Sequence, residues 1–385
     1  MTHGCPAHRR RRPIVLAFAV AFAAGALARP AAAQQWPIVA RDSAARMHRI
    51  GAGVYAIIHD DATTDWETGV FEWPHGNTGV IVGDDGVLVI DATYLPSRAR
   101  ADIALIRSVT QKPVRYLVNT HWHGDHTHGN GVYRDEFPNL VILGQEANRD
   151  WIATNLARYP AVVAKGGGGK ATTLKRLSEL LSAGRDSTGK ALTDAQKVAL
   201  ARNIAQRRNE IDEFTTIQLA PPTLLFDQNM VVYLGTRRVE LHNWGRANSP
   251  ADVSVYAPDE KVLFVGDIVV YPVPFVGASH PLPWIDVLNG IERVPTVALV
   301  PGHGPVLSDF TYPRLVRDLL EVTRDRVRAA MAQGTLSADA VKTIDLADFR
   351  ERFLRIKEFN MAAQWSGTPE VLVARMYDCV QGYRC

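Results

Sequence analysis

The segment HWHGDHTHGN, residues 121 to 130, directly follows the apolar run VRYLVNT at 114 to 120. The segment places four histidines and one aspartate within eight positions, although the whole chain of 385 residues has only 12 histidines. A short apolar run of this kind predicts a buried strand. Because ligand sites in layered α/β folds gather at the carboxyl ends of buried strands, the segment predicts an α/β fold with a site at this edge of its sheet.

The spacing HxHxDH within this segment is typical of metal ligands. His121 and His123 lie two apart on extended chain, so their side chains point to the same side. Asp125 and His126 begin a new turn and can face a second ion. Imidazole nitrogen and carboxylate oxygen suit zinc, and they also admit iron or manganese. A histidine cluster that only packs or is solvated explains this spacing poorly, so we predict a metal site.

Apolar runs along the rest of the chain predict the other layers. Strands are expected at 53–60, 77–93 (interrupted by the hairpin signal Asp84-Asp85-Gly86), 230–244, 252–258, 261–270 and 296–306, and a helix at 97–110. Residues 146–212 have helical periodicity, with a glycine run at 166–169 that lacks the GK[ST] ending of a phosphate loop and predicts a mobile loop. From Arg314 onward the pattern is helical. We therefore expect a main domain at 34–310 with a helical insertion at about 146–212, and a helical C-terminal extension at 311–385.

The order of these motifs resembles the metallo-β-lactamase-fold hydrolases, from about residue 50 to about residue 310. HWHGDH is similar to their metal-binding signature, FVGDIVV places Asp267 where they have a bridging carboxylate at a strand end, and VPGHGPV places His303 where they have a final histidine ligand. The resemblance implies an αββα sandwich with a dinuclear zinc site at one edge of two packed sheets.

One motif departs from the family pattern. In WGRANSPADVSVY, residues 244 to 256, Gly245, Ser249 and Asp252 match, but Asn248 stands where the family has a histidine. An amide oxygen is a much weaker zinc ligand than imidazole. His242 is an unsuitable substitute, because it falls within a predicted strand, where we expect it to pack or to form a hydrogen bond. The stretch resembles a branch of exported family members in which GRxN replaces the histidine-bearing motif.

The resemblance thus implies two metal sites, the first of them the weaker. Site one would comprise His121, His123 and a weak or water-mediated Asn248; site two would comprise Asp125, His126 and His303; Asp267 would bridge both. A hydroxide held between two such ions is nucleophilic at neutral pH, and Asp125 would orient it. The expected activity is the opening of a cyclic amide or ester, such as a β-lactam or a lactone. Two alternatives remain open, namely an iron-dependent oxidative enzyme and a non-catalytic metal- or ligand-binding member.

The N-terminus predicts export. Basic HRRRR precedes an apolar run of about fifteen residues and an A-x-A site ending at Ala33, as in a cleavable signal peptide of residues 1–33. A spanning helix needs about 20 apolar residues, so we expect no stable membrane span after cleavage and a periplasmic or secreted protein. Export would allow Cys379 and Cys385 to form a disulfide. The balance of 43 basic and 40 acidic residues argues against nucleic acid as a partner and leaves a small-molecule substrate.

Three further features have both a functional and a structural explanation. His128 and His280 could line the pocket or be ordinary packed or surface histidines. The aromatic segment at 65–77, with Trp66, Phe71, Trp73 and His75, could fold over the metals or simply pack as a small cluster.

Overall fold

The computed structural model describes residues 1–2, 36–59, 63–64, 71–72, 75–154, 170–356, 365–383 and 385. The signal peptide predicted at 1–33 and the glycine run at 166–169 lie outside these residues. Most of the aromatic segment at 65–77 also lies outside them, including Trp66 and Trp73.

The larger sheet has eight strands in the order β1-β2-β3-β6-β7-β8-β9-β10. Their bounds are β1 Ile38–Arg41, β2 Ala45–Gly51, β3 Val54–His59, β6 Thr78–Val82, β7 Val87–Ile90, β8 Val114–Val118, β9 Val141–Gln145 and β10 Leu224–Phe226. The strands pair antiparallel from β1 to β7, and β7 to β10 are parallel. Because β7, β8 and β9 are parallel, their carboxyl ends meet at one edge, where the histidine-rich segment begins.

The smaller sheet has five strands, β11 Asn229–Leu234, β12 Arg237–Asn243, β13 Val253–Ala257, β14 Val262–Val270 and β15 Ala298–His303. β14 and β15 pair in parallel, so they too end at one edge. All residues of β13, β14 and β15 are buried, as expected for strands covered on both faces. A separate hairpin joins β4 Thr63–Thr64 to β5 Phe71–Glu72.

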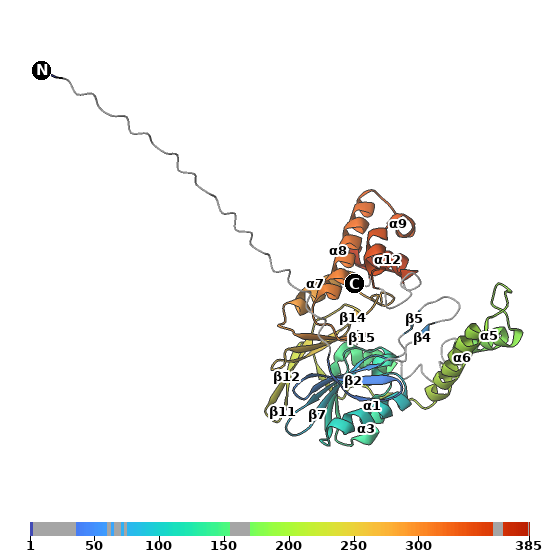
Figure 1. Cartoon of the computed structure of the whole chain (residues 1–385), viewed down its shortest axis with the longest axis vertical. Coiled ribbons are helices and arrows are strands. Elements are labelled where there is room, and N and C mark those ends of the chain that lie inside the picture. The colour runs from blue at the N-terminus through green and yellow to red at the C-terminus, as the bar shows by residue number, and fades with distance from the viewer. Residues whose placement is uncertain are drawn as a thin grey trace. The chain divides into compact units, whose positions relative to one another are not determined.

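Apolar faces stack these elements into four layers (Figure 1). The two sheets share a core that includes Ile81 and Leu88 from one and Val255 and Phe264 from the other. Outside the larger sheet lie α1 Pro96–Val109 and α3 Asn130–Glu136; outside the smaller sheet lie α7 Pro281–Glu292, α8 Thr311–Ala332, α9 Ser337–Thr343, α10 Ala347–Phe353 and α12 Thr368–Val380. The predicted αββα sandwich is confirmed.

Two helices of the insertion, α5 Lys170–Ala183 and α6 Asp194–Phe214, lie side by side and share a small apolar cluster around Leu177 and Leu200. The C-terminal end of α6 is fixed to α1. Glu213 accepts hydrogen bonds from the backbone nitrogen and the hydroxyl of Ser97, at 2.8 and 2.6 Å. These bonds occupy free N–H and O–H groups in the first turn of α1, whose N-cap residue Leu95 provides no side-chain cap. This anchor holds α6 beside the edge where the site lies.

Helices form the described part of the C-terminal extension, as predicted. The buried residues Val316, Leu319, Leu320 and Val327 lie on one face of α8, the spacing expected of a helix packed on a core. Cys379 and Cys385 are joined by a disulfide, which confirms the predicted pair. Among the described residues, no helix combines the length and the apolar character needed to cross a membrane.

Candidate metal centre

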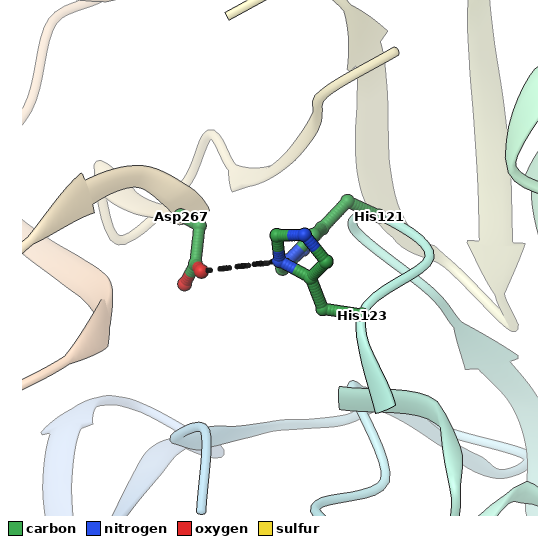
Figure 2. A group of neighbouring side chains, drawn as sticks. All are labelled: His121, His123 and Asp267. Atoms are coloured by element: carbon green, nitrogen blue, oxygen red, sulfur yellow. Dashed lines mark hydrogen bonds and ion pairs between the residues drawn. The ribbon is translucent and has the colours of Figure 1, made fainter. Parts of the chain in front are cut away.

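The fold brings six of the seven predicted ligands together from four segments. His121 and His123 follow β8, Asp125 and His126 lie on the single turn α2 Gly124–Thr127, Asp267 lies on β14, and His303 ends β15. They form two groups, His121 with His123 and Asp267, and Asp125 with His126 and His303; within each group the donor atoms lie within 4.8 Å of one another. The second group has the residues expected for site two, and the first joins His121 and His123 of site one to Asp267, the expected bridging residue. Figure 2 shows the first group, with the carboxylate of Asp267 facing the two imidazoles.

Asp267 stands between the two groups. Its Oδ2 atom lies 3.4 Å from Nε2 of His121 and 3.8 Å from Nδ1 of His123. Its Oδ1 atom lies 3.2 Å from Nε2 of His126 and 3.6 Å from Nε2 of His303. Each carboxylate oxygen thus faces one group, which is the position that a bridging ligand requires.

The strand position of Asp267 differs from the expected one. The sequence predicts Asp267 at a strand end, but β14 continues to Val270. Regular pairing with β15 is instead interrupted on both sides of Gly266, which has a φ of 50°. A Cβ atom on Gly266 would lie 2.4 Å from the Thr120 hydroxyl. Glycine therefore allows the bulge, and the bulge turns the Asp267 side chain toward the histidines.

The donor set fits metal ions on geometric grounds. Nε2 of His121 lies 2.8 Å from Nδ1 of His123, and Nε2 of His126 lies 3.3 Å from Nε2 of His303. Ring nitrogens this close must share a proton or a cation. Oδ1 of Asp267 is buried and accepts no well-directed hydrogen bond from any residue that the structure describes. Converging nitrogen and carboxylate donors with an unsatisfied oxygen are what zinc, iron or manganese sites require.

Charge keeps most of these donors in their metal-binding forms. Burial raises the pKa of Asp267, but His126, His121 and His303 outweigh burial and hold the pKa well below its ordinary value. Burial and the neighbouring charge of His126 lower the pKa of His121 to about 4, so this ring is neutral at pH 7. His126 is the exception. Burial lowers its pKa, but the carboxylates of Asp267, Asp125 and Asp91 raise it well above 6.5, so a metal ion displaces its proton.

Asp91, at the end of β7, orients His126 from behind. Its Oδ2 atom lies 2.8 Å from Nδ1 of His126 and accepts the Thr120 hydroxyl at 2.7 Å. Its Oδ1 atom accepts the backbone nitrogen of Thr120 at 2.8 Å. When Nδ1 donates its hydrogen to a carboxylate, the lone pair of Nε2 is left to bind a metal ion. Asp91 was not predicted as a site residue, although an aspartate that directly follows the apolar run VLVI is a usable signal.

Asp91→Asn should therefore weaken zinc binding by about 10- to 100-fold while the fold is retained. The amide cannot accept from both Thr120 groups and from His126, so one bond is lost whichever way it turns. Competition with a chelator measures the loss, and circular dichroism checks the fold. Unchanged zinc affinity would show that Asp91 does not orient His126.

Gly76 and Asn77 together form a clamp on the two segments that carry Asp125 and His303. The backbone nitrogen of Gly76 donates to the Asp125 carbonyl at 3.1 Å. The side-chain amide of Asn77 donates to the carbonyls of Pro301 and Gly304, at 3.0 and 2.8 Å, on either side of His303. Neither residue was predicted, because backbone contacts of this kind leave no mark in the local pattern.

Gly76→Ala should displace His126, because the added Cβ would lie 2.3 Å from Cε1 of that ring. The expected result is loss of the ion bound near His126, with the ion near His121 retained. Zinc content per chain, compared before and after dialysis, measures this. Two tightly held ions in the variant would rule out the clamp.

Asn248 is buried but is held differently from the six other predicted ligands. Its Nδ2 atom donates to the backbone carbonyl of Phe275 at 2.7 Å. The surrounding turn is tied by Asp252, whose Oδ2 atom accepts the backbone nitrogens of Ala247 and Ser249 at 3.1 and 2.8 Å. Burial raises the pKa of Asp252 to about 7. Whether Asn248 binds a metal ion stays a prediction.

A cavity of about 860 Å³ opens beside the two groups. His123, Asp125, Asp267 and His303 lie in its wall. The remaining wall has three sources: Tyr94, His128, Arg207 and Glu210 on the α6 side, the continuous segment 270–277 after β14, and Ser366, Gly367, Thr368 and Val371 at the start of α12. Residues from both the insertion and the C-terminal extension thus reach the cavity that holds the metal centre.

The other histidines have ordinary surroundings or shape this wall. His242 lies within β12 and its Nε2 atom is 3.1 Å from the Glu240 carboxylate, which confirms the expected hydrogen bond. His128 stacks on Tyr94 with ring centroids 5.3 Å apart and lines the cavity. His280 begins α7 and is not among the described residues that line the cavity. His75 is buried with Nδ1 2.9 Å from the Thr93 hydroxyl.

Comparison with known proteins agrees with this geometry. The family model of the metallo-beta-lactamase superfamily matches residues 71–303. A linear primary-alkylsulfatase from Pseudomonas sp. (strain ATCC 19151) is 22% identical over 259 residues, which is 64% of this chain and 44% of that protein.

Two solved structures share the fold. A metallo-beta-lactamase from Pontibacter korlensis has a TM-score of 0.50 at 15% identity, over 72% of this chain and 99% of that one. The stereoselective inverting sec-alkylsulfatase Pisa1 from Pseudomonas sp. has a TM-score of 0.54 at 15% identity, over 86% of this chain and 49% of that one. The chain thus spans about half the length, or less, of the two alkylsulfatases. The chain belongs to the metallo-beta-lactamase superfamily.

Proposed function

We propose that the protein is an exported zinc-dependent hydrolase that opens a cyclic amide or ester with a substantial apolar part. One observation carries this proposal: six imidazole and carboxylate donors form two adjoining groups around Asp267, and the groups open directly onto a cavity of about 860 Å³. A donor set for two ions beside a substrate-sized space is the arrangement of a two-metal hydrolase.

Each side chain has a definite part in this chemistry. Bound zinc would supply Lewis acidity, polarising the scissile carbonyl and lowering the pKa of a water molecule. His121 and His123 would hold one ion, and His126 and His303 the other, with Asp267 shared between them. Asp125 is the exposed member, with 27% of its side chain accessible, and Nε2 of His303 lies 3.0 Å from its Oδ2 atom. Asp125 is therefore placed to orient the attacking water from the cavity side.

The charge of the cavity favours a substrate that is neutral at the reacting bond. Arg207 is the single arginine or lysine among the described residues of the wall, and its guanidinium lies 3.2 Å from Glu210. Within the described part of the wall, a negatively charged substrate would therefore find little compensating charge besides that of bound metal ions. The apolar side chains of segment 270–277 and Val371 suit a hydrocarbon portion instead.

Hydrolysis of alkyl sulfate esters is the second candidate, because two of the related proteins are alkylsulfatases. The apolar wall suits an alkyl chain, and among the described residues of the wall only Arg207, which is paired with Glu210, could assist bound zinc ions in holding the sulfate group.

A panel of three substrates decides between them. We expect the zinc-loaded protein to hydrolyse a chromogenic cephalosporin or an aromatic lactone faster than an alkyl sulfate. Absorbance measures the first two reactions, and the release of sulfate measures the third. Sulfate release as the faster reaction would establish the second candidate. No turnover of any member would contradict both.

We also propose that the enzyme works outside the cytoplasm, on the strength of the signal-peptide pattern at 1–33. The intact mass of the protein recovered from the periplasm should correspond to a chain that begins at or near Gln34. A chain that keeps its N-terminus there would refute cleavage.

A further inference from the structure

Asn248 forms a hydrogen bond with the wall of the cavity and lies on a turn next to the predicted site one. A carbonyl oxygen only accepts hydrogen bonds, so the amide nitrogen of Asn248 must be the atom that faces Phe275, at 2.7 Å. The amide oxygen is then left over. It is buried and has no hydrogen-bond partner among the described residues. Because an unpaired buried acceptor is costly, this position favours a further partner for Oδ1.

The turn that carries Asn248 is fixed beside site one. The backbone nitrogen of Val253 donates to the Thr120 carbonyl at 2.9 Å, one residue before His121. On the other side, the nitrogen of His280 donates to the Ala247 carbonyl at 2.7 Å. The turn that carries Asn248 is therefore held both to the segment before His121 and to the residue before α7.

Phe275 is a wall residue whose side chain contacts site one. Its ring lies edge-on to the ring of His123, with centroids 5.7 Å apart. Phe275 and its neighbours in segment 270–277 line the cavity without interruption. The side chain of Phe275 is 48% exposed, and the backbone carbonyl of Phe275 accepts the hydrogen bond from Asn248.

We propose that Asn248 couples the occupancy of site one to the wall of the substrate cavity. Its buried Oδ1 atom would serve as the third donor of site one, while its Nδ2 atom holds segment 270–277 through the bond to the Phe275 carbonyl. A cation on the amide oxygen withdraws electron density and makes the N–H group a stronger donor. Filling site one thus tightens the wall. The coupling rests on the metal centre of the proposed function, but it does not depend on any substrate.

Three substitutions separate the two halves of this role. Asn248→Ala loses both the donor to zinc and the donor to Phe275. Asn248→Asp keeps an oxygen for zinc. Its carboxylate, however, has no N–H group to donate to the Phe275 carbonyl. Asn248→His supplies a stronger zinc ligand on one ring nitrogen and an N–H donor on the other. Asn148 offers a control for the turn by itself, because its amide donates at 2.9 Å to the carbonyl of Ala251, which belongs to the turn that carries Asn248.

Two measurements are made on each folded variant, neither of which needs turnover. Chelator competition gives the two zinc affinities, and hydrogen–deuterium exchange follows the peptide at 270–277 with zero, one and two equivalents of zinc. In the natural protein the second equivalent should slow exchange in that peptide. Asn248→Ala should weaken the second zinc about tenfold or more and abolish the slowing.

The other variants complete the test. Asn248→Asp should bind the second zinc at least as tightly as the natural protein, without slower exchange at 270–277. Asn248→His should narrow the gap between the two affinities and keep the slowing, and Asn148→Asp should alter neither measurement at site one. Natural zinc affinities in Asn248→Ala, or zinc-dependent slowing in Asn248→Asp, would overturn the coupling.

Failure of the coupling and failure of the proposed function give different results. A natural protein that hydrolyses the panel but shows no exchange response to the second zinc refutes the coupling alone. A protein that shows the response and hydrolyses no panel member refutes the proposed reaction alone.

Discussion

Asp267→Ala is expected to lower kcat/KM by more than about a hundredfold, because loss of even an indirect partner of a metal ligand costs 10- to 100-fold. Both oxygens of this carboxylate face imidazole nitrogens, Oδ2 toward His121 and Oδ1 toward His126. Removing the side chain therefore disturbs both groups at once. It also leaves the surrounding imidazoles without the negative charge that lies between them.

The measurement combines steady-state kinetics with zinc content per chain and circular dichroism. Zinc content should fall at both sites, which distinguishes Asp267→Ala from the loss of a single ligand. His121→Ala, Asp125→Ala and His303→Ala should each lower activity by orders of magnitude for the same chemical reason. His242→Ala is the control, because that ring is bound to Glu240, and its activity should stay normal. Full activity in any of the four site variants would refute the ligand assignment.

Removal of the metal should abolish hydrolysis, and zinc should restore it. Among the described residues, the lining of the cavity offers acidic and histidine side chains around the reacting position but no serine–histidine or cysteine–histidine nucleophile pair within hydrogen-bond distance. Without an ion, these groups have no means of generating a strong nucleophile at neutral pH. The chelated protein should therefore be inactive although folded.

Readdition of different metals tests the nature of the site. About two zinc ions per chain support the two-metal hydrolase, and about one supports an enzyme that uses site two alone. Activity that returns with iron and requires oxygen would instead establish the oxidative alternative. Hydrolysis that survives complete chelation would contradict metal dependence altogether.

Substrate choice is decided by segments outside the histidine signature. Arg207 and Glu210 come from α6, Val371 comes from α12, and segment 270–277 connects β14 to α7. These wall residues lie far apart in sequence from His121, and local patterns predict their helices but not the surface those helices share. The relatives that share the fold include a metallo-beta-lactamase and an alkylsulfatase, so the fold by itself leaves the substrate open.

Part of the fold could be predicted from the sequence, because a strand that is buried on both faces is apolar along its whole length. The runs at 261–270 and 114–120 are β14 and β8, close to the expected bounds. β2 and β9 were not singled out. In β2 only Ala45, Met47 and Ile50 are buried, and β9 contains glycine and glutamine. Strands of this kind are stabilised by pairing with their neighbours, so the local pattern is weak.

The sequence by itself identified the candidate donors of the centre. The spacing HxHxDH, an aspartate and a histidine on two later strands predicted six residues that the fold does bring together. Spacing and ligand chemistry are enough to predict the donors of the HxHxDH segment, whereas Asp267, His303 and the unusual Asn248 were implied by the resemblance to the metallo-β-lactamase-fold hydrolases. The cysteine pair followed from the predicted export.

Only the tertiary structure decided how these donors are held. Asp91 behind His126, Gly76 against the same ring and Asn77 beside His303 act through contacts between residues far apart in the chain. The hydrogen bond from Asn248 to Phe275 is of the same kind. Such contacts depend on how two sheets and their loops meet in space. The local sequence pattern does not predict these contacts, because each joins residues far apart in the chain, and those of Asn77 and Asn248 end on backbone carbonyls, which every residue has.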